Sequence, residues 1–502
     1  MGLVGYELVR LAVVGFAKKL IRRGAIQFLR EHRVRLESAR FIDRVWMRER
    51  LAWDPEIEAA ILDAARETGE PIPSLRQRVD EYVEEIAPYF SISSYYQLGG
   101  NLAKVVINFC FELVVDHGGF DRQAKRVPPG AIRIYVINHR SNFDPVILAF
   151  GLLQHVSMSY AVGEWALVWP LSTLFRSFGS YFVRRGEEDP LYHKTLERFV
   201  QLLAGHGAVT GFFIEGGLSR DGVLRRPKTG LLDYLVKVRR EYPDREVIFL
   251  PVGINYDRVL EDRYLVRERN GRRPKKILLL RLWNLVAIAF WLPILIAANV
   301  LKVATRSHKK FGYAAISFGE PLKITDWPGG ATLHELSADE RKDKVDALAE
   351  ELLYRRIGAV VPVMPVPVLC LALLRSSNGE NSDLVKMIRE VIAEFRLLKA
   401  PMAFGEAFEG IFRRRQQNRA QTQMPRVDED LIDVEEAELV LELAQFQLVR
   451  RRILRKRPDG LDVMDRPMVE YYANSVIHHL SPELLTDRPP EVQRTEPDVQ
   501  AR

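Results

Sequence analysis

The chain has few of the residues and motifs that mark metal-dependent or cofactor-dependent proteins. Its 502 residues include two cysteines, Cys110 and Cys370, and both lie in apolar runs. We interpret them as small core residues rather than as metal ligands or a disulfide, which indicates a reducing compartment. The sequence also has no Walker loop, no dinucleotide-binding glycine fingerprint and no zinc spacing. We therefore expect no metal and no bound cofactor.

A cleavable signal peptide is not evident either. The apolar segment 3–16 is interrupted by Glu7 and Arg10, and basic residues follow it. This pattern predicts an amphipathic helix that packs on its own protein or lies on a membrane surface. The hydrophobic fraction of 47% is that of a globular protein, which excludes a polytopic transporter.

Acidic residues are outnumbered by basic ones, with 66 Asp and Glu against 73 Lys and Arg, so the net charge is +7. This balance favours anionic partners: a phosphate ester, a membrane surface or nucleic acid. The basic run 450–457 has no interleaved aromatic residues. We interpret it as a membrane-facing or solvated helix end, and we expect no nucleic-acid partner.

Composition and periodicity divide the chain into consecutive regions. Residues 1–125 are predicted to be helical, with apolar residues at helical spacing over 102–115. The break at residues 128–130 opens an α/β domain over 126–330, and a second helical region covers 331–485. The Pro-rich and charged end, 486–502, is predicted to be a disordered tail.

Short apolar strands alternate with helix-like segments in the central region. Strands are predicted at 132–137, 181–183, 209–214 and 247–252, and helices at 146–153, 191–203 and 230–238. This alternation predicts an α/β fold in which a mainly parallel sheet is flanked by helices. Ligands of such sheets bind at the carboxyl ends of the strands.

An apolar insertion, 277–305, follows the predicted sheet strands. Residues 282–301 carry no charge, and basic residues lie on both sides of them. The segment is long enough to span a bilayer, but a span would place the predicted strand 313–318 on the opposite side from its partners. We favour a Pro-broken monotopic or re-entrant segment, with a true span or a core hairpin as the alternatives.

A histidine and an aspartate follow the first predicted strand, in the run Asn-His-Arg-Ser-Asn-Phe-Asp-Pro at 138–145. His139 could act as a general base, with Asp144 fixing its tautomer. Asp144 and Pro145 also have the pattern of a helix N-cap and first turn. Spacing alone cannot decide, because His334 and Asp339 share it; we interpret His334 as a solvated residue before a helix.

Three later strand exits also carry polar or glycine-rich motifs. Arg184 and Arg185 follow one strand and could be solvated or form a fork for phosphate. The next exit reads Glu-Gly-Gly-Leu-Ser-Arg at 215–220, where glycines allow close approach to an anion or simply form a turn. Lys228 follows, and Pro251 is expected to break the ladder of the last strand.

Together these blocks have the order of the glycerolipid acyltransferase superfamily: H-x4-D, G-x-x-F-x-R, F-x-E-G-x-x-S and V-P-x. The chain resembles the long, membrane-bound bacterial glycerol-3-phosphate 1-O-acyltransferases in particular, over roughly residues 95–480. The late segment Tyr471-Tyr472-Ala473-Asn474 is similar to that family's C-terminal Tyr-Tyr-x-Asn motif. One departure is Leu218, where similar bacterial members have arginine.

The resemblance implies a role for each matching residue. His139 is expected to be the catalytic base and Asp144 its partner. Pro251 is expected to support the acyl-donor side. The residues expected to bind glycerol phosphate are Arg184, Glu215, Gly216, Ser219, Arg220 and Lys228.

The implied function is transfer of a fatty acyl group from acyl-CoA or acyl-carrier protein to the sn-1 hydroxyl of glycerol 3-phosphate, giving lysophosphatidic acid for phospholipid synthesis. A phospholipid membrane is the expected partner, at the cytoplasmic face of a bacterial inner membrane. Two alternatives remain. The same chemistry could use lysophosphatidate or dihydroxyacetone phosphate, or the chain could be a catalytically silent membrane scaffold.

Overall fold

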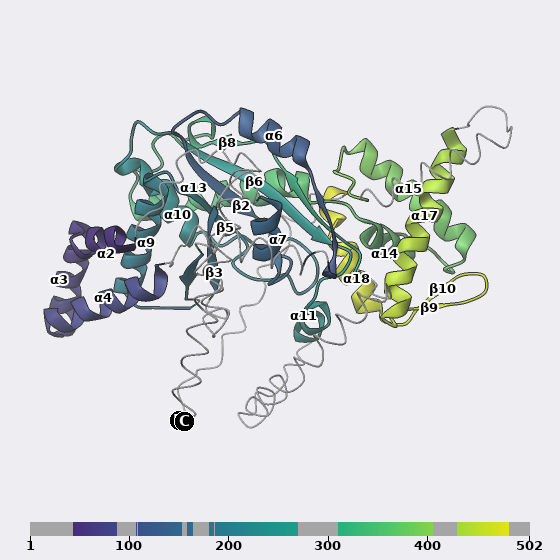
Figure 1. Ribbon diagram of the computed structural model, residues 1–502, viewed down its shortest axis with the longest axis horizontal. Coiled ribbons are helices and arrows are strands. Elements are labelled where there is room, and N and C mark those ends of the chain that lie inside the picture. Colours follow the sequence, from purple (N-terminus) through teal and green to yellow (C-terminus); the bar gives the residue numbers. More distant parts are fainter. Residues whose placement is uncertain are drawn as a thin grey trace, which may run out of the picture. The chain divides into compact units, whose positions relative to one another are not determined.

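The computed structural model describes residues 44–87, 107, 109–152, 158–163, 180–184, 186–269, 310–404 and 429–480 (Figure 1). The predicted amphipathic segment 3–16, the apolar insertion 277–305 and the tail 486–502 lie outside these residues. Among the residues that are described, no helix is both long and apolar enough to cross a bilayer.

The chain forms two compact units, and each is assembled from separate segments. Unit 1 consists of Met1–Gly217, Arg226–Ile254 and Ile316–Leu353. Unit 2 consists of Leu218–Arg225, Asn255–Ala315 and Tyr354–Arg502. Composition predicts consecutive regions, because it cannot show which distant segments pack together.

An eight-stranded sheet has the order β1-β7-β6-β2-β5-β3-β4, with β8 paired to β6. The neighbours β6, β2, β5, β3 and β4 are parallel to one another, which confirms the predicted fold class. The strands are β1 (Glu112–Val115), β2 (Ile132–Ile137), β3 (Met158–Gly163), β4 (Tyr181–Val183), β5 (Val209–Phe213), β6 (Val247–Tyr256), β7 (Tyr313–Phe318) and β8 (Leu322–Lys323).

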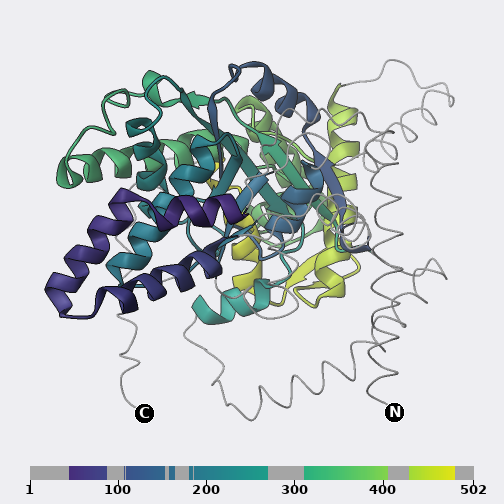
Figure 2. The same ribbon diagram turned by 60° about the vertical axis from the view of Figure 1, so that its left-hand side comes forward.

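Helices flank this sheet in unit 1. The three helices before the first strand pack beside α9 (Pro190–Gly205), as the purple ribbon of Figure 2 shows. Helix α9 is buried along most of its length, because the sheet lies on one side of it and helices on the other. The other helices are α2 (Arg44–Ala52), α3 (Pro55–Thr68), α4 (Ile72–Ile86), α6 (His117–Lys125), α7 (Asp144–Gly151), α10 (Gly230–Val236) and α13 (Ala338–Glu350).

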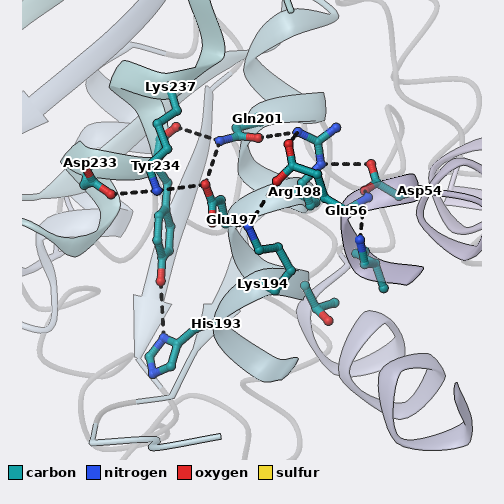
Figure 3. Close-up of polar contacts among 12 residues, drawn as sticks. Asp54, Glu56, His193, Lys194, Glu197, Arg198, Gln201, Asp233, Tyr234 and Lys237 are labelled. Atoms are coloured by element: carbon teal, nitrogen blue, oxygen red, sulfur yellow. Dashed lines mark hydrogen bonds and ion pairs between the residues drawn. The ribbon is translucent and has the colours of Figure 1, made fainter. Parts of the chain in front are cut away.

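A buried polar network joins α9 to the helices around it (Figure 3). The Arg198 guanidinium donates to Asp54 at 2.8 Å and to the amide oxygen of Gln201 at 2.7 Å. The Lys237 ammonium lies 2.9 Å from both Glu197 and Asp233. Buried charges are tolerated when they are paired in this way, and removing one member leaves the other uncompensated.

Unit 2 is mainly helical. Its central helix, α14 (Pro365–Arg375), is apolar and buried on nearly all sides, which is the pattern of a helix surrounded by others. It contains Cys370, which is buried, as expected of a core residue. The other elements are α11 (Asp262–Arg269), α15 (Asn381–Leu397), α17 (Glu429–Arg450), the hairpin β9 (Leu454–Lys456) and β10 (Leu461–Val463), and α18 (Arg466–Asn474).

The structure corrects the predicted helical spacing over 102–115. Residues Glu112–Val115 form the sheet strand β1, where the paired valines favour extended backbone. A second correction concerns His334, which is buried at 9% exposure instead of being solvated. Its carbonyl accepts a hydrogen bond from Arg240 at 2.7 Å. Burial and the nearby Arg239 lower the pKa of His334.

Candidate functional site

The order of the parallel strands places a ligand-binding crevice at the carboxyl ends of β2 and β5. These two strands are parallel neighbours. The chain leaves β5 toward β6 on one side and leaves β3, the other neighbour of β5, toward β4 on the other side. Connections that diverge in this way form a topological switch point, where α/β sheets bind ligands. His139 follows β2, and Glu215 follows β5. Both residues therefore lie where the topology predicts a site.

His139 and Asp144 are in direct contact. The imidazole Nδ1 lies 2.9 Å from Asp144 Oδ2, and Asp144 has no exposed surface. The same carboxylate oxygen accepts the backbone N–H groups of Arg140 at 2.7 Å and Ser141 at 3.0 Å. Three donors thus converge on one oxygen, which fixes both the carboxylate and the loop that carries His139. With Nδ1–H donating to Asp144, the Nε2 lone pair is the basic position of the ring.

The expected N-cap role of Asp144 is wrong. Helix α7 begins at Asp144 itself, and its cap residue, Phe143, makes no side-chain cap hydrogen bond. Oδ2 of the Asp144 carboxylate bonds backwards to the loop, where it is used by residues 139–141. Pro145 does lie in the first turn, as expected.

Glu215 holds the backbone of His139. Its Oε1 accepts the His139 N–H at 2.8 Å, and its side chain is buried, with the residue 1% exposed. The ladder brings the two residues together, because Ile214 N–H donates to the Ile137 carbonyl at 3.0 Å. The imidazole also stacks on Phe213, with ring centroids 4.2 Å apart. Sequence resemblance alone assigned Glu215 to the substrate and did not show this positioning contact.

Gly216 and Lys228 lie side by side at the exit of β5. Gly216 has a φ of +61°, and a Cβ at this position would lie 2.7 Å from Lys228 Cγ. The Lys228 N–H donates to the Ile214 carbonyl at 2.7 Å, which brings the chain back to β5 after the intervening loop. A glycine is thus required on two grounds, and the exposed residue Lys228 packs its side-chain stem against it.

Arg184 makes a different set of contacts. Its Nε and Nη2 donate to the two oxygens of Glu85 at 2.8 and 2.7 Å, and its Nη1 donates to Glu187 at 2.8 Å. Hydrogen bonds from the guanidinium to Glu85 and Glu187 raise the pKa of Arg184. Arg185 lies outside the described residues.

Ser219 and Arg220 belong to the loop Leu218–Arg225 of unit 2. The buried Ser219 hydroxyl donates to the Val223 carbonyl at 2.7 Å and accepts the Gly222 N–H at 3.0 Å, which closes a tight turn. Arg220 is paired with Glu268, with Nε 3.1 Å from Oε2. Their expected role in binding glycerol phosphate stays a prediction.

A cation also lies beside Leu218, the position where the resemblance leads us to expect arginine. Arg225 Nη1 donates to the Leu218 carbonyl at 3.2 Å. The side chain seven residues on thus brings positive charge next to this apolar residue.

The C-terminal Tyr-Tyr-x-Asn segment braces the same loop within unit 2. Asn474 Nδ2 donates to the Asp221 carbonyl at 2.8 Å. Gly222, with a φ of +89°, packs so tightly that a Cβ there would lie 1.9 Å from the Tyr471 carbonyl oxygen. Tyr472 is held by Arg451, whose Nη1 lies 2.9 Å from its hydroxyl oxygen. The motif that sequence resemblance singled out is therefore a brace for the loop.

Pro251 does not break the ladder of β6. The strand continues from Val247 to Tyr256, with Pro251 opposite Val136 of β2. The Pro251 carbonyl accepts the Gly319 N–H at 2.9 Å. The N–H and carbonyl of one strand residue face the same neighbour. The missing N–H therefore faces the end of β7, and the pairing with β2 is unaffected. Its expected place on the acyl-donor side stays a prediction.

Comparisons with known proteins agree with this arrangement. The Acyltransferase family model matches residues 121–255, and the model of the glycerol-3-phosphate acyltransferase C-terminal region matches residues 297–486. A glycerol-3-phosphate acyltransferase of Xylella fastidiosa strain 9a5c is 29% identical over 346 residues, which are 66% of this chain and 37% of that protein. One from Xanthomonas campestris is 28% identical over 364 residues, covering 70% and 38%. One from Actinobacillus pleuropneumoniae serotype 3 is 25% identical over 402 residues, covering 79% and 45%.

The chain spans less than half the length of these curated relatives. Among solved structures, the 1-acyl-sn-glycerophosphate acyltransferase of Thermotoga maritima aligns over 52% of this chain and 81% of that one. Its sequence identity is 17% and its TM-score 0.28.

The parallel sheet and the His139–Asp144 pair at the carboxyl end of β2 agree with the two family matches, by which the chain is similar to acyltransferases of the glycerolipid acyltransferase superfamily. Within that superfamily, the relatives it resembles are the glycerol-3-phosphate acyltransferases.

Proposed function

We propose that this protein transfers a fatty acyl group from a thioester to the sn-1 hydroxyl of glycerol 3-phosphate, releasing lysophosphatidic acid. The observation that carries the proposal is the contact between His139 Nδ1 and Asp144 Oδ2 at 2.9 Å, at the carboxyl end of the parallel strand β2. A base held in one tautomer beside a ligand crevice suits the activation of a hydroxyl. The names of the curated relatives support the acceptor.

The chemistry follows from the orientation of the imidazole. His139 Nε2 takes the proton of the acceptor hydroxyl as its oxygen attacks the thioester carbonyl carbon. The carbon–sulfur bond breaks when the tetrahedral intermediate collapses, and the imidazolium returns the proton to the thiolate of acyl-CoA or acyl-carrier protein. Asp144 stabilises the imidazolium while it exists. The acyl group is transferred directly, so no acyl-enzyme forms.

Lys228 is proposed to bind the phosphate of the acceptor. It is an exposed cation whose side chain packs against Gly216, next to Glu215, so it can pair with a dianion at the mouth of the crevice. Arg220 and Ser219 are further candidates by resemblance. We also propose that the protein works at the cytoplasmic face of a membrane, because its product is amphiphilic and its basic charge suits anionic lipid.

A labelled-acyl transfer assay tests the reaction. Purified full-length protein is offered glycerol 3-phosphate, dihydroxyacetone phosphate and lysophosphatidate, each with acyl-CoA or acyl-carrier protein as donor. We expect glycerol 3-phosphate to be preferred, and we expect His139→Ala to lower kcat by about 10²- to 10⁴-fold, the usual contribution of a positioned base. His193→Ala is the matched control. His193 lies on α9, where its ring contacts the Tyr234 hydroxyl and the Glu187 carbonyl oxygen. Near-normal transfer by His139→Ala would contradict the mechanism.

A further inference from the structure

The arginine at the exit of β4 is surrounded by protein groups on several sides. Glu85 binds it through two parallel hydrogen bonds, and Glu187 binds a third N–H group. The guanidinium also lies over the rings of Tyr82 and Tyr192, at 5.2 and 5.4 Å from their centroids. A bidentate carboxylate contact combined with cation–π packing is among the most specific environments that an arginine can have.

One stripe of α4 supplies this environment. Arg78, Tyr82 and Glu85 are spaced so that they share a helix face, which turns toward the connection between β4 and α9. The Tyr82 hydroxyl donates to Asp189 at 2.6 Å, and Arg78 lies 3.6 Å from the same carboxylate. Asp189 is in turn the N-cap of α9. The stripe therefore binds both the exit of β4, through Arg184, and the start of α9, through Asp189.

The charge of this cluster is unfavourable for a phosphate. The contacts connect two guanidinium groups with four carboxylates, which belong to Glu70, Glu85, Glu187 and Asp189. An approaching dianion would meet net negative charge. Lys228, in contrast, lies beside Gly216 at the exit of β5, which β3 separates from β4 in the sheet.

A second polar contact attaches the other helix of the same hairpin. Asp54 and Glu56, at the start of α3, pair with Arg198 and Lys194 of α9 (Figure 3). The α3–α4 hairpin is thus held at both ends, by Arg198 under α3 and by Arg184 under α4. Both arginines pair with carboxylates of the hairpin, although Arg198 is more buried and only Arg184 lies in a motif that the family resemblance assigns to substrate.

We propose that Arg184 is a positioning residue that anchors α4 at the exit of β4, and that recognition of the acceptor phosphate does not pass through it. This inference rests on the proposed acyl transfer for its kinetic test. It changes the basis of phosphate specificity, which then depends on Lys228 and on the loop that follows Glu215.

Competitive inhibition by inorganic phosphate against glycerol 3-phosphate tests whether Arg184 anchors α4 or binds phosphate. Glu85→Gln, Arg184→Gln, the double variant and Lys228→Ala are compared in full-length protein. We expect Glu85→Gln and Arg184→Gln to lower kcat/KM by a similar factor, on the order of 3- to 10-fold. The double variant should have a kcat/KM no lower than that of the less active single variant. The Ki of phosphate should change less than about 2-fold in these three variants and rise about 10-fold in Lys228→Ala.

Glu84→Gln is the matched control, because Glu84 lies next to Glu85 on α4 and pairs with Arg48 at 2.5 Å. It should leave the phosphate Ki and kcat/KM unchanged. A phosphate Ki that rises in Arg184→Gln as much as in Lys228→Ala, and falls in Glu85→Gln, would overturn the inference.

A thermal unfolding cycle with the same variants makes the test independent of activity. If the wild-type protein transfers no acyl group, the proposed function fails, but the anchor still predicts that the Tm losses of Glu85→Gln and Arg184→Gln are not additive. Strictly additive losses would overturn the anchor as well.

Discussion

At the residue scale, the candidate site depends on carboxylates that hold backbone. Asp144 collects the N–H groups of the loop after β2, and Glu215 holds the N–H of His139 itself. His139 and Asp144 could be predicted from sequence, because their positions after a strand and before a helix are visible in the pattern. The direction of the Asp144 hydrogen bonds could not be predicted from sequence, because it depends on the three-dimensional path of four loop residues.

The role of Glu215 is open to a direct kinetic test. Glu215→Ala would leave the buried His139 N–H without this acceptor, which costs about 1–3 kcal/mol. We expect kcat to fall by about 10- to 100-fold, following that cost, while the KM for glycerol 3-phosphate changes little. Glu215→Gln keeps a carbonyl oxygen for the same hydrogen bond and should restore most of kcat. If Gln and Ala instead raise KM equally, Glu215 acts on the substrate through its charge.

At the element scale, most strands and helices could be predicted, and the exceptions have physical causes. The strands 132–137, 181–183 and 313–318 have the predicted bounds, because apolar runs end at clear breaks. The sequence does not predict strand β3, because its buried Met158, Tyr160 and Val162 alternate with small or polar residues and give a weak signal. The pattern predicts helix where strand β1 lies, because its four residues follow an apolar helical pattern.

The loop Leu218–Arg225 shows how one element depends on another. Asn474→Asp replaces the donor to the Asp221 carbonyl with a second acceptor, so the loop should loosen. We expect the KM for glycerol 3-phosphate to rise about 3- to 10-fold, the cost of about one hydrogen bond, with a smaller change in kcat. Steady-state kinetics on both substrates measure this.

Asn378→Asp is the control for that substitution. The Asn378 side-chain oxygen accepts the Glu380 N–H at 3.0 Å, and aspartate keeps this acceptor. Equal kinetic effects of the two variants would show that the loss is not specific to the brace.

At the scale of the whole molecule, the segments of each unit are interleaved along the chain. Residues 218–225 leave unit 1 for unit 2, and Ile316–Leu353 returns to unit 1. Patterns in the sequence describe neighbours along the chain, so they predict the sheet and its helices but not this interleaving. The polar clusters around Arg184 and Arg198 were invisible for the same reason, since their partners lie about 100 or more residues away.

Acid should destabilise unit 2 through His479. Burial lowers the pKa of His479 to about 4, and its Nε2 lies 2.9 Å from the Val361 carbonyl oxygen. Because the folded pKa lies below the unfolded value of about 6.5, the unfolded chain binds the proton first. Stability is therefore full above about pH 6.5 and declines toward pH 4, by about 2–3 kcal/mol at pH 4.5.

Urea unfolding at pH 7.5 and 4.5 measures this loss. His479→Gln keeps a donor for Val361 but cannot be protonated, so it should remove that part of the pH dependence. A variant with the same decline as the wild type would show that other groups cause it.

The brace between Asn474 and Asp221 also has a consequence for synthesis of the chain. The two residues are 253 positions apart. At about 5–20 residues per second, a ribosome adds Asn474 roughly 13–50 s after Asp221. The strands that carry His139 and Glu215 are complete well before then, whereas the loop 218–225 acquires this support only after Asn474 has been added. A nascent chain can therefore form its base early and brace this loop only much later.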